Sequence, residues 1–151
     1  MDVEEIDRKE IISLVEEELN KIRLLLKEMA DYKGNTRLYR RAKGSILHDF
    51  YNACERIFAI IARRINGGFS SDQEWHKTLL NQMTIAFKAI RPAVLSRPLA
   101  SELDGYLAFR HLFRNIYGFE LDSRRLDQLG KRLPKVARLF QKEIKGFLKK
   151  L

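Results

Sequence analysis

The residues best suited to chemistry lie close together between positions 110 and 117. They are two arginines, a histidine, an asparagine and a tyrosine: Arg110, His111, Arg114, Asn115 and Tyr117. Arginine can contact a phosphate at two points and stabilise negative charge as it develops. Histidine can transfer a proton near neutral pH, and a tyrosine hydroxyl can donate a hydrogen bond or accept a modification. The set predicts a site for phosphate chemistry; the alternative is a solvated helix face whose arginines pair with acidic side chains.

The spacing predicts that a single helix starting near Leu103 carries these side chains. Its apolar residues recur every three or four positions, at Leu103, Tyr106, Phe109, Phe113 and Ile116. Arg110, Arg114 and Tyr117 would form a polar stripe beside them. Gly118 is expected to end this helix, as a glycine just past the last turn commonly does.

The remaining pattern predicts four more helices around this one. The first two expected helices span residues 3–31 and 36–66, and Thr36 caps the second. The third runs from Ser71 to Pro92, with Ser71 and Glu74 forming its cap, and the last runs from Asp122 to the end. Residues 91–101 read as an ordered loop, after which Ser101 caps the helix with the polar set. Gly44, inside the second helix, indicates either close packing at this point or a glycine that the helix simply tolerates. The chain is therefore predicted to be one all-α domain, residues 1–151, folded as an up-and-down bundle of about five helices.

Composition limits the classes of protein that fit. The chain has 151 residues and a net charge of +9, unevenly distributed. Residues 1–31 hold ten acids and five bases, whereas residues 123–151 hold ten bases and two acids. The basic C-terminal segment is typical of a protein that binds RNA or DNA. The alternative is that this segment pairs with the acidic first helix inside the bundle. No apolar run is long enough to span a membrane, and the acidic start lacks the apolar core of a signal peptide, so a cytoplasmic protein is expected.

Several other kinds of site are disfavoured. His48, His76 and His111 fall on three different predicted helices, without the spacing of a metal site. Cys54 is the single cysteine and lies on the apolar stripe of the second helix, which favours a buried structural thiol over a nucleophile. No glycine-rich phosphate loop follows a predicted strand. We therefore expect neither a metal nor a cofactor.

Several separated blocks of sequence resemble one known family. They are HDFYNACERIFAIIARRI, EWHKTLLNQM, RPAVLS and FRHLFRNIYGFELD, in this order, within about residues 38–140. Together they resemble the HepT-like family, the toxin half of HEPN–nucleotidyltransferase toxin–antitoxin pairs.

The resemblance implies an all-helical homodimer that acts as a metal-independent endoribonuclease on RNA. The family motif is an arginine and a polar residue, three further residues, then histidine, any residue and tyrosine. It maps onto Arg110, His111 and Tyr117, but its histidine position holds Asn115. Arg110 and Arg114 would bind phosphate, and a cognate minimal nucleotidyltransferase antitoxin would transfer AMP to Tyr117.

The asparagine at position 115 leaves the activity of this chain open. An amide cannot titrate near pH 7, and general acid–base help is commonly worth about 10²- to 10⁴-fold in rate. Activity is therefore expected to be weakened or abolished, unless His111 substitutes. Two alternatives remain: a non-catalytic helical module that docks the nucleotidyltransferase, and a non-specific RNA-binding bundle that uses its basic last helix.

Overall fold

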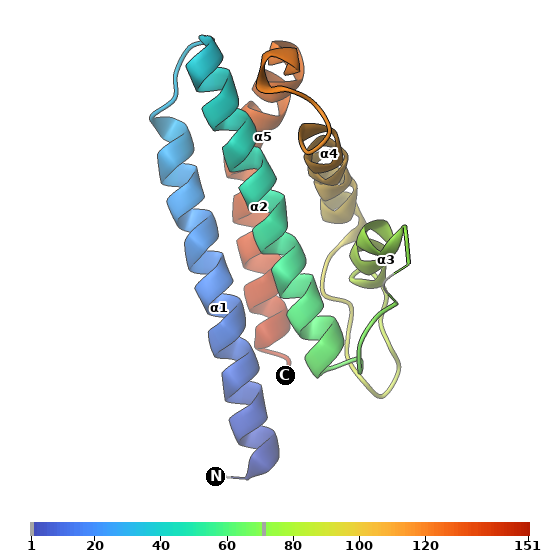
Figure 1. Cartoon of the computed structure of the whole chain (residues 1–151). Coiled ribbons are helices and arrows are strands. Elements are labelled where there is room, and N and C mark those ends of the chain that lie inside the picture. Colours follow the sequence, from blue (N-terminus) through green and yellow to red (C-terminus); the bar gives the residue numbers. More distant parts are fainter. Residues whose placement is uncertain (1, 71) are drawn as a thin grey trace.

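The computed structural model describes residues 2–70 and 72–151, apart from the side chain of Phe119, and its described part consists of helices and their connections. Its elements are α1 (Val3–Ala30), α2 (Arg37–Arg64), α3 (Trp75–Gln82), α4 (Arg97–Phe113), the short 3₁₀ helix η1 (Gly118–Glu120) and α5 (Ser123–Leu148). The described residues contain one isolated bridge, between Phe87 and Arg91, and no strand. Helices α1, α2, α4 and α5 run alternately up and down, and the short α3 lies beside the end of α2 (Figure 1). This confirms the predicted all-α bundle.

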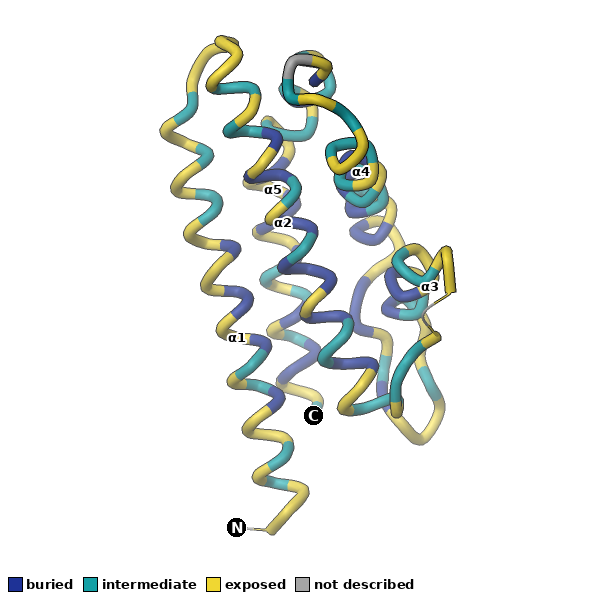
Figure 2. Tube along the Cα trace, viewed as in Figure 1, coloured by how far each residue is buried: buried dark blue, intermediate teal, exposed yellow. Residues whose placement is uncertain are grey.

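The core forms around α2, which contacts every other helix. Phe50, Tyr51 and Phe58 on α2 are completely buried, and Phe50 and Phe58 meet Tyr106 of α4 and Phe140 of α5 edge-on. Buried positions run along much of α2, whereas α1 exposes most of its outer side (Figure 2). Burying one large apolar side chain contributes about 1.5–3 kcal/mol, so these contacts fix how α4 and α5 lie on α2.

The helix starts follow local capping chemistry, with one correction. Thr36 and Asp122 cap α2 and α5 as predicted, each accepting a backbone N–H in the first turn. The prediction that Ser101 caps the fourth helix is wrong, because α4 begins at Arg97 with Ser96 as its cap. Pro98 is compatible with this start, since proline fits the first turn of a helix, where its missing N–H is not needed.

The third helix is much shorter than predicted. It ends at Gln82 rather than near Pro92, and its expected cap, Ser71, lies outside the described residues. The chain turns because the buried guanidinium of Arg91 donates to the carbonyl oxygens of Gln82, Ile85 and Pro92, at 2.9–3.0 Å. These bonds hold residues 83–96 as a loop that packs beside α3.

The fourth helix also ends early, at Phe113 rather than at Gly118. The segment after it folds back over the first half of α2, so that Leu121 reaches the core. Gly44 permits this: a Cβ there would lie 3.0 Å from the ring of Phe113 and 3.2 Å from Leu121. The close packing that Gly44 suggested is therefore present, and it is formed by the turn that ends α4.

None of the helices in the described part of the chain combines the length and the apolar composition needed to cross a bilayer.

Candidate functional site

Arg110 occupies the last turn of α4 and points inward, toward α2 and α3. Its side chain is only 13% exposed. The Nε–H donates to Oδ1 of Asn52, and Nη1 lies 3.7 Å from Oε1 of Glu55 and 3.3 Å from Nδ1 of His76. The arginine predicted to bind phosphate is thus held by side chains from two other helices.

A buried carboxylate organises this site. Glu55, on α2, is 7% exposed, and its Oε2 lies 2.8 Å from Nδ1 of His76 at the start of α3. Because a carboxylate only accepts hydrogen bonds, Nδ1 carries the proton in this contact, and Nε2 of the neutral ring is then a proton acceptor. The ring of Trp75 stacks on His76 with centroids 3.6 Å apart. The histidine is therefore fixed in position and still 26% exposed at its side chain.

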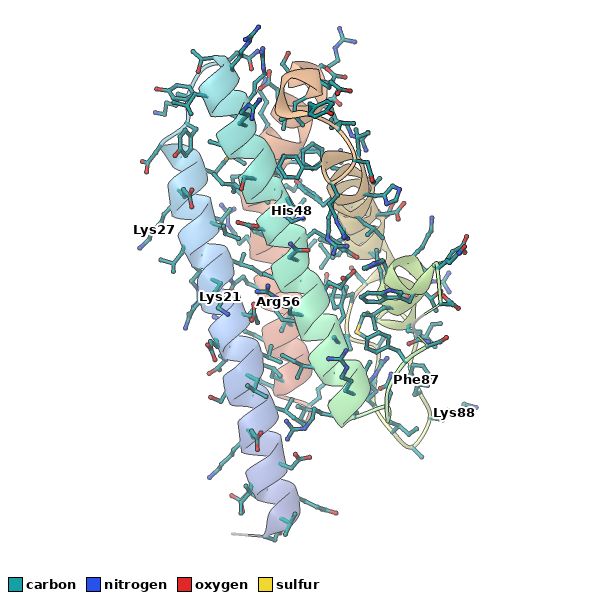
Figure 3. All side chains as sticks on the ribbon, in the orientation of Figure 1. Lys21, Lys27, His48, Arg56, Phe87 and Lys88 are labelled. Carbon is teal, nitrogen blue, oxygen red and sulfur yellow. The ribbon has the colours of Figure 1, made fainter. Side chains whose placement is uncertain are left out.

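A second histidine joins the same network through Asn52. The Asn52 amide Nδ2 lies 3.3 Å from Nδ1 of His48 (labelled in Figure 3), whose ring packs against Phe113 with centroids 5.3 Å apart. His48, Asn52 and Glu55 are spaced by four and three residues, which places them on one side of α2. We call His48, Asn52, Glu55, His76 and Arg110 the Arg110 cluster.

The hydroxyl of Tyr51 lies next to this cluster without a hydrogen-bond partner. It is the one buried tyrosine oxygen in the described residues that lacks one. Burial raises the pKa of Tyr51 well above its usual value, and the negative charge of Glu55 raises it further. Tyr51 therefore stays a neutral phenol at physiological pH.

A surface hollow of about 390 Å³ adjoins the cluster where α1 meets α2. Asn52 contributes to its lining, together with Lys21 and Arg56. These two cations lie across from each other on α1 and α2 (Figure 3), and both pair with the buried carboxylate of Glu18, at 3.0 and 3.9 Å. Asp49 also lines the hollow, so the surface beside the cluster on this side carries charges of both signs.

The other four predicted site residues do not join Arg110. His111, Arg114, Asn115 and Tyr117 are all exposed, and Tyr117 is 70% exposed. The predicted polar stripe is wrong, because α4 ends at Phe113: Arg114 is its C-cap and Tyr117 precedes η1. The roles of these residues stay predictions.

Asn115 has a structural contact of its own. Its side-chain amide donates to the backbone oxygen of His111 at 2.7 Å. This bond satisfies a carbonyl that the end of α4 would otherwise leave without a partner. His111 shares no hydrogen bond with Arg110 in the described structure, whereas His76 lies beside it.

Sequence reasoning missed four of the five members of the Arg110 cluster. His48 and His76 were considered only as metal ligands, and they do lie on different helices, but Asn52 and Arg110 connect them. No group of three or more potential metal ligands occurs in residues 2–70 and 72–151. The available signal was Glu55, an acid between the apolar residues Cys54 and Ile57.

The cluster combines groups that suit phosphate chemistry. A guanidinium stabilises negative charge on phosphate oxygens, and an imidazole oriented by a carboxylate can accept a proton. Because Glu55 offsets part of the charge of Arg110, the pair is positioned without leaving an isolated cation in the protein.

Comparison with known proteins identifies the family. The model of a family described as HepT-like protein matches residues 42–151. No curated protein and no solved structure matches the chain. The match begins inside α2 and includes the whole Arg110 cluster, together with the turn that carries Asn115 and Tyr117. On this match, the chain belongs to the HepT-like protein family.

Proposed function

We propose that this protein is the toxin subunit of a HEPN–nucleotidyltransferase toxin–antitoxin pair, and that it cleaves RNA without a metal ion. Membership of the HepT-like family supports a HEPN-type, toxin-like protein. The observation that supports a catalytic role is that Arg110 lies beside His76, whose ring is oriented by the buried carboxylate of Glu55.

The proposed reaction is a transfer within the RNA strand. The ribose 2′-hydroxyl attacks the neighbouring phosphorus, so an O2′–P bond forms while the P–O5′ bond breaks. Nε2 of His76 accepts the hydroxyl proton, and Arg110 stabilises the additional negative charge on the phosphorane. The departing 5′ oxygen takes a proton from a second acid, for which His111 is the candidate. The products are a 2′,3′-cyclic phosphate and a 5′-hydroxyl.

Asn115 limits this activity in our proposal. It stands where the family motif has histidine, and its amide supplies no proton near neutral pH. His76 and His111 then provide proton transfer that is less well placed. The family resemblance also implies a homodimer, and we propose that two copies bring their Arg110 clusters to one shared RNA site.

The test is cleavage of a fluorescent RNA in excess EDTA. We expect weak cleavage by the chain with Asn115 and a gain of about 10²-fold or more in Asn115→His, since a titratable group is restored. In this background His76→Gln should lower the rate and change its dependence on pH, because the amide cannot accept the proton. An Asn115→His protein that is folded, dimeric and inactive on every RNA tried would contradict the proposal.

A second candidate function is a non-catalytic module that docks a nucleotidyltransferase. The exposure of Tyr117 favours it, since an acceptor phenol must enter the active site of another protein. AMP on Tyr117 would add a bulky anion a few residues from Arg114. With the partner and ATP, the wild-type chain should gain the mass of one or more AMP units and Tyr117→Phe should gain none; equal labelling of both would reject this role.

A further inference from the structure

The outer side of α5 carries a continuous row of positive charge. Six cations recur at intervals of four and three residues: Lys131, Lys135, Arg138, Lys142, Lys145 and Lys149. All six are exposed, and Lys149 is the C-cap of the helix. At 1.5 Å per residue, the row is about 27 Å long. We call these six residues the α5 cation row.

The row lies directly opposite the buried side of the helix. With about 100° of rotation per residue, each of the six lies within roughly 40° of the direction opposite Phe140. Phe140 is fully buried, as are Leu133 and Ile144 on the same side. From position 131 onward, no acidic or apolar residue shares the sector that the row occupies. The arrangement is therefore a single-sign surface along the helix.

The protein does not neutralise this charge itself. In the described structure, none of the six side chains has an ion pair or a hydrogen bond, although cations elsewhere do. Arg132, next to the row, pairs with Glu102, and Arg64 of α2 pairs with Asp7 and Glu10 of α1. Like charges four residues apart on a helix repel one another, so the row is unfavourable for folding until a partner supplies negative charge.

We infer that the α5 cation row binds the phosphate backbone of RNA, independently of the Arg110 cluster. A polynucleotide offers evenly spaced negative charge over the length of the row, and each neutralised phosphate releases bound counterions. A membrane surface fits less well, because an amphipathic helix binds a bilayer by inserting its apolar side, and that side of α5 is already buried in the bundle.

Two variants of equal charge test this surface. Lys135→Gln, Arg138→Gln and Lys142→Gln together remove half of the row. The matched control removes three exposed cations elsewhere, with Lys27→Gln, Arg37→Gln and Lys88→Gln; Lys27 and Lys88 project into solvent from α1 and from the loop after α3 (Figure 3). Both proteins lose the same net charge, so any difference in their RNA affinity is due to where on the surface the charge was removed.

The measurement is binding of a fluorescent 2′-O-methyl RNA in EDTA at several salt concentrations. This RNA cannot be cleaved through its 2′ oxygen, so the result does not depend on the proposed ribonuclease activity. Six phosphate contacts to a single strand give a slope of log affinity against log salt concentration of about −4, and the three contacts that remain in the row variant give a slope of about −2. We expect at least a tenfold loss of affinity near 100 mM salt in the row variant and less than a threefold loss in the control.

Three results would overturn the inference. They are equal losses in both variants, no RNA binding by the wild-type protein, and binding to vesicles of acidic lipid but not to RNA. Arg110→Lys separates the two sites, since the row variant should lose clearly more affinity for RNA than Arg110→Lys, which changes a single phosphate contact. A loss of affinity in Arg110→Lys with none in the row variant would place RNA binding at the Arg110 cluster instead.

Discussion

The sharpest prediction concerns Glu55, whose carboxylate lies between Arg110 and His76. Glu55→Ala removes the acceptor 2.8 Å from His76 and the negative charge 3.7 Å from Arg110. Both charged side chains of the pair are nearly enclosed, at 9% and 13% exposed. Removing one partner of a buried ion pair costs about 3–5 kcal/mol, and because Arg110 retains some contact with solvent we expect about 3 kcal/mol. In a protein of this size, that lowers the melting temperature by roughly 6–12 °C.

A double-mutant cycle assigns this loss to the pair. Arg110→Met removes the charge that Glu55→Ala leaves uncompensated, so the double variant should be less destabilised than the sum of the two single variants, by about 1–3 kcal/mol. The control is Glu102→Ala, which breaks the more exposed pair with Arg132 and should cost under about 1 kcal/mol. Urea unfolding followed by circular dichroism measures the stability of the wild-type protein and of all four variants. Additive losses, or a loss from Glu55→Ala no larger than that of the control, would refute the view that Glu55 holds Arg110 in place.

Three further predictions concern buried polar groups. Tyr106→Phe removes the hydrogen bond that the phenol donates to the backbone oxygen of Leu129, and it should lower the free energy of unfolding by about 1 kcal/mol. Tyr51→Phe removes a hydroxyl that has no hydrogen-bond partner, so it should be neutral or stabilising in the same urea assay. Burial raises the pKa of both phenols, so the folded protein keeps protons that the unfolded chain releases above about pH 10. Stability should then be complete below pH 10 and fall as pH rises, by up to about 1.4 kcal/mol per pH unit for each phenol, and either phenylalanine variant should show a shallower fall. Arg91→Met should cost at least about 2 kcal/mol in thermal unfolding, since it leaves several oxygens without their donor; an unchanged melting temperature would show that Arg91 does not hold the loop.

The helices were predictable from local pattern, but their ends were less so. The three- and four-residue periodicity found α1, α2 and α5 to within two or three residues, because it reports which side of a helix is buried. It failed in residues 83–90, where the bonds of Arg91 replace helical hydrogen bonds. It failed again after Phe113, where packing of Leu121 and Phe113 over Gly44 outweighs the continuing apolar stripe. Both failures come from contacts between segments distant in sequence.

The candidate site divides in the same way. Arg110 stood out because a dense polar set surrounded it in sequence and because the strings around it resembled one family. Its structural partners Asn52, Glu55 and His76 come from two other helices, and no spacing within one helix could connect them to Arg110. Conversely, a stripe shared by Arg110, Arg114 and Tyr117 requires a helix that continues to Gly118, whereas α4 ends at Phe113.

The most direct test of the proposed function is the initial rate of RNA cleavage in excess EDTA, measured in the Asn115→His background with and without Arg110→Lys. Lysine keeps a positive charge opposite Glu55, so the variant should fold, but it loses the planar two-point contact with phosphate. We predict a loss of about 10²-fold or more in rate with no change in fold or in oligomeric state. Equal rates for the two proteins would contradict a ribonuclease site at Arg110.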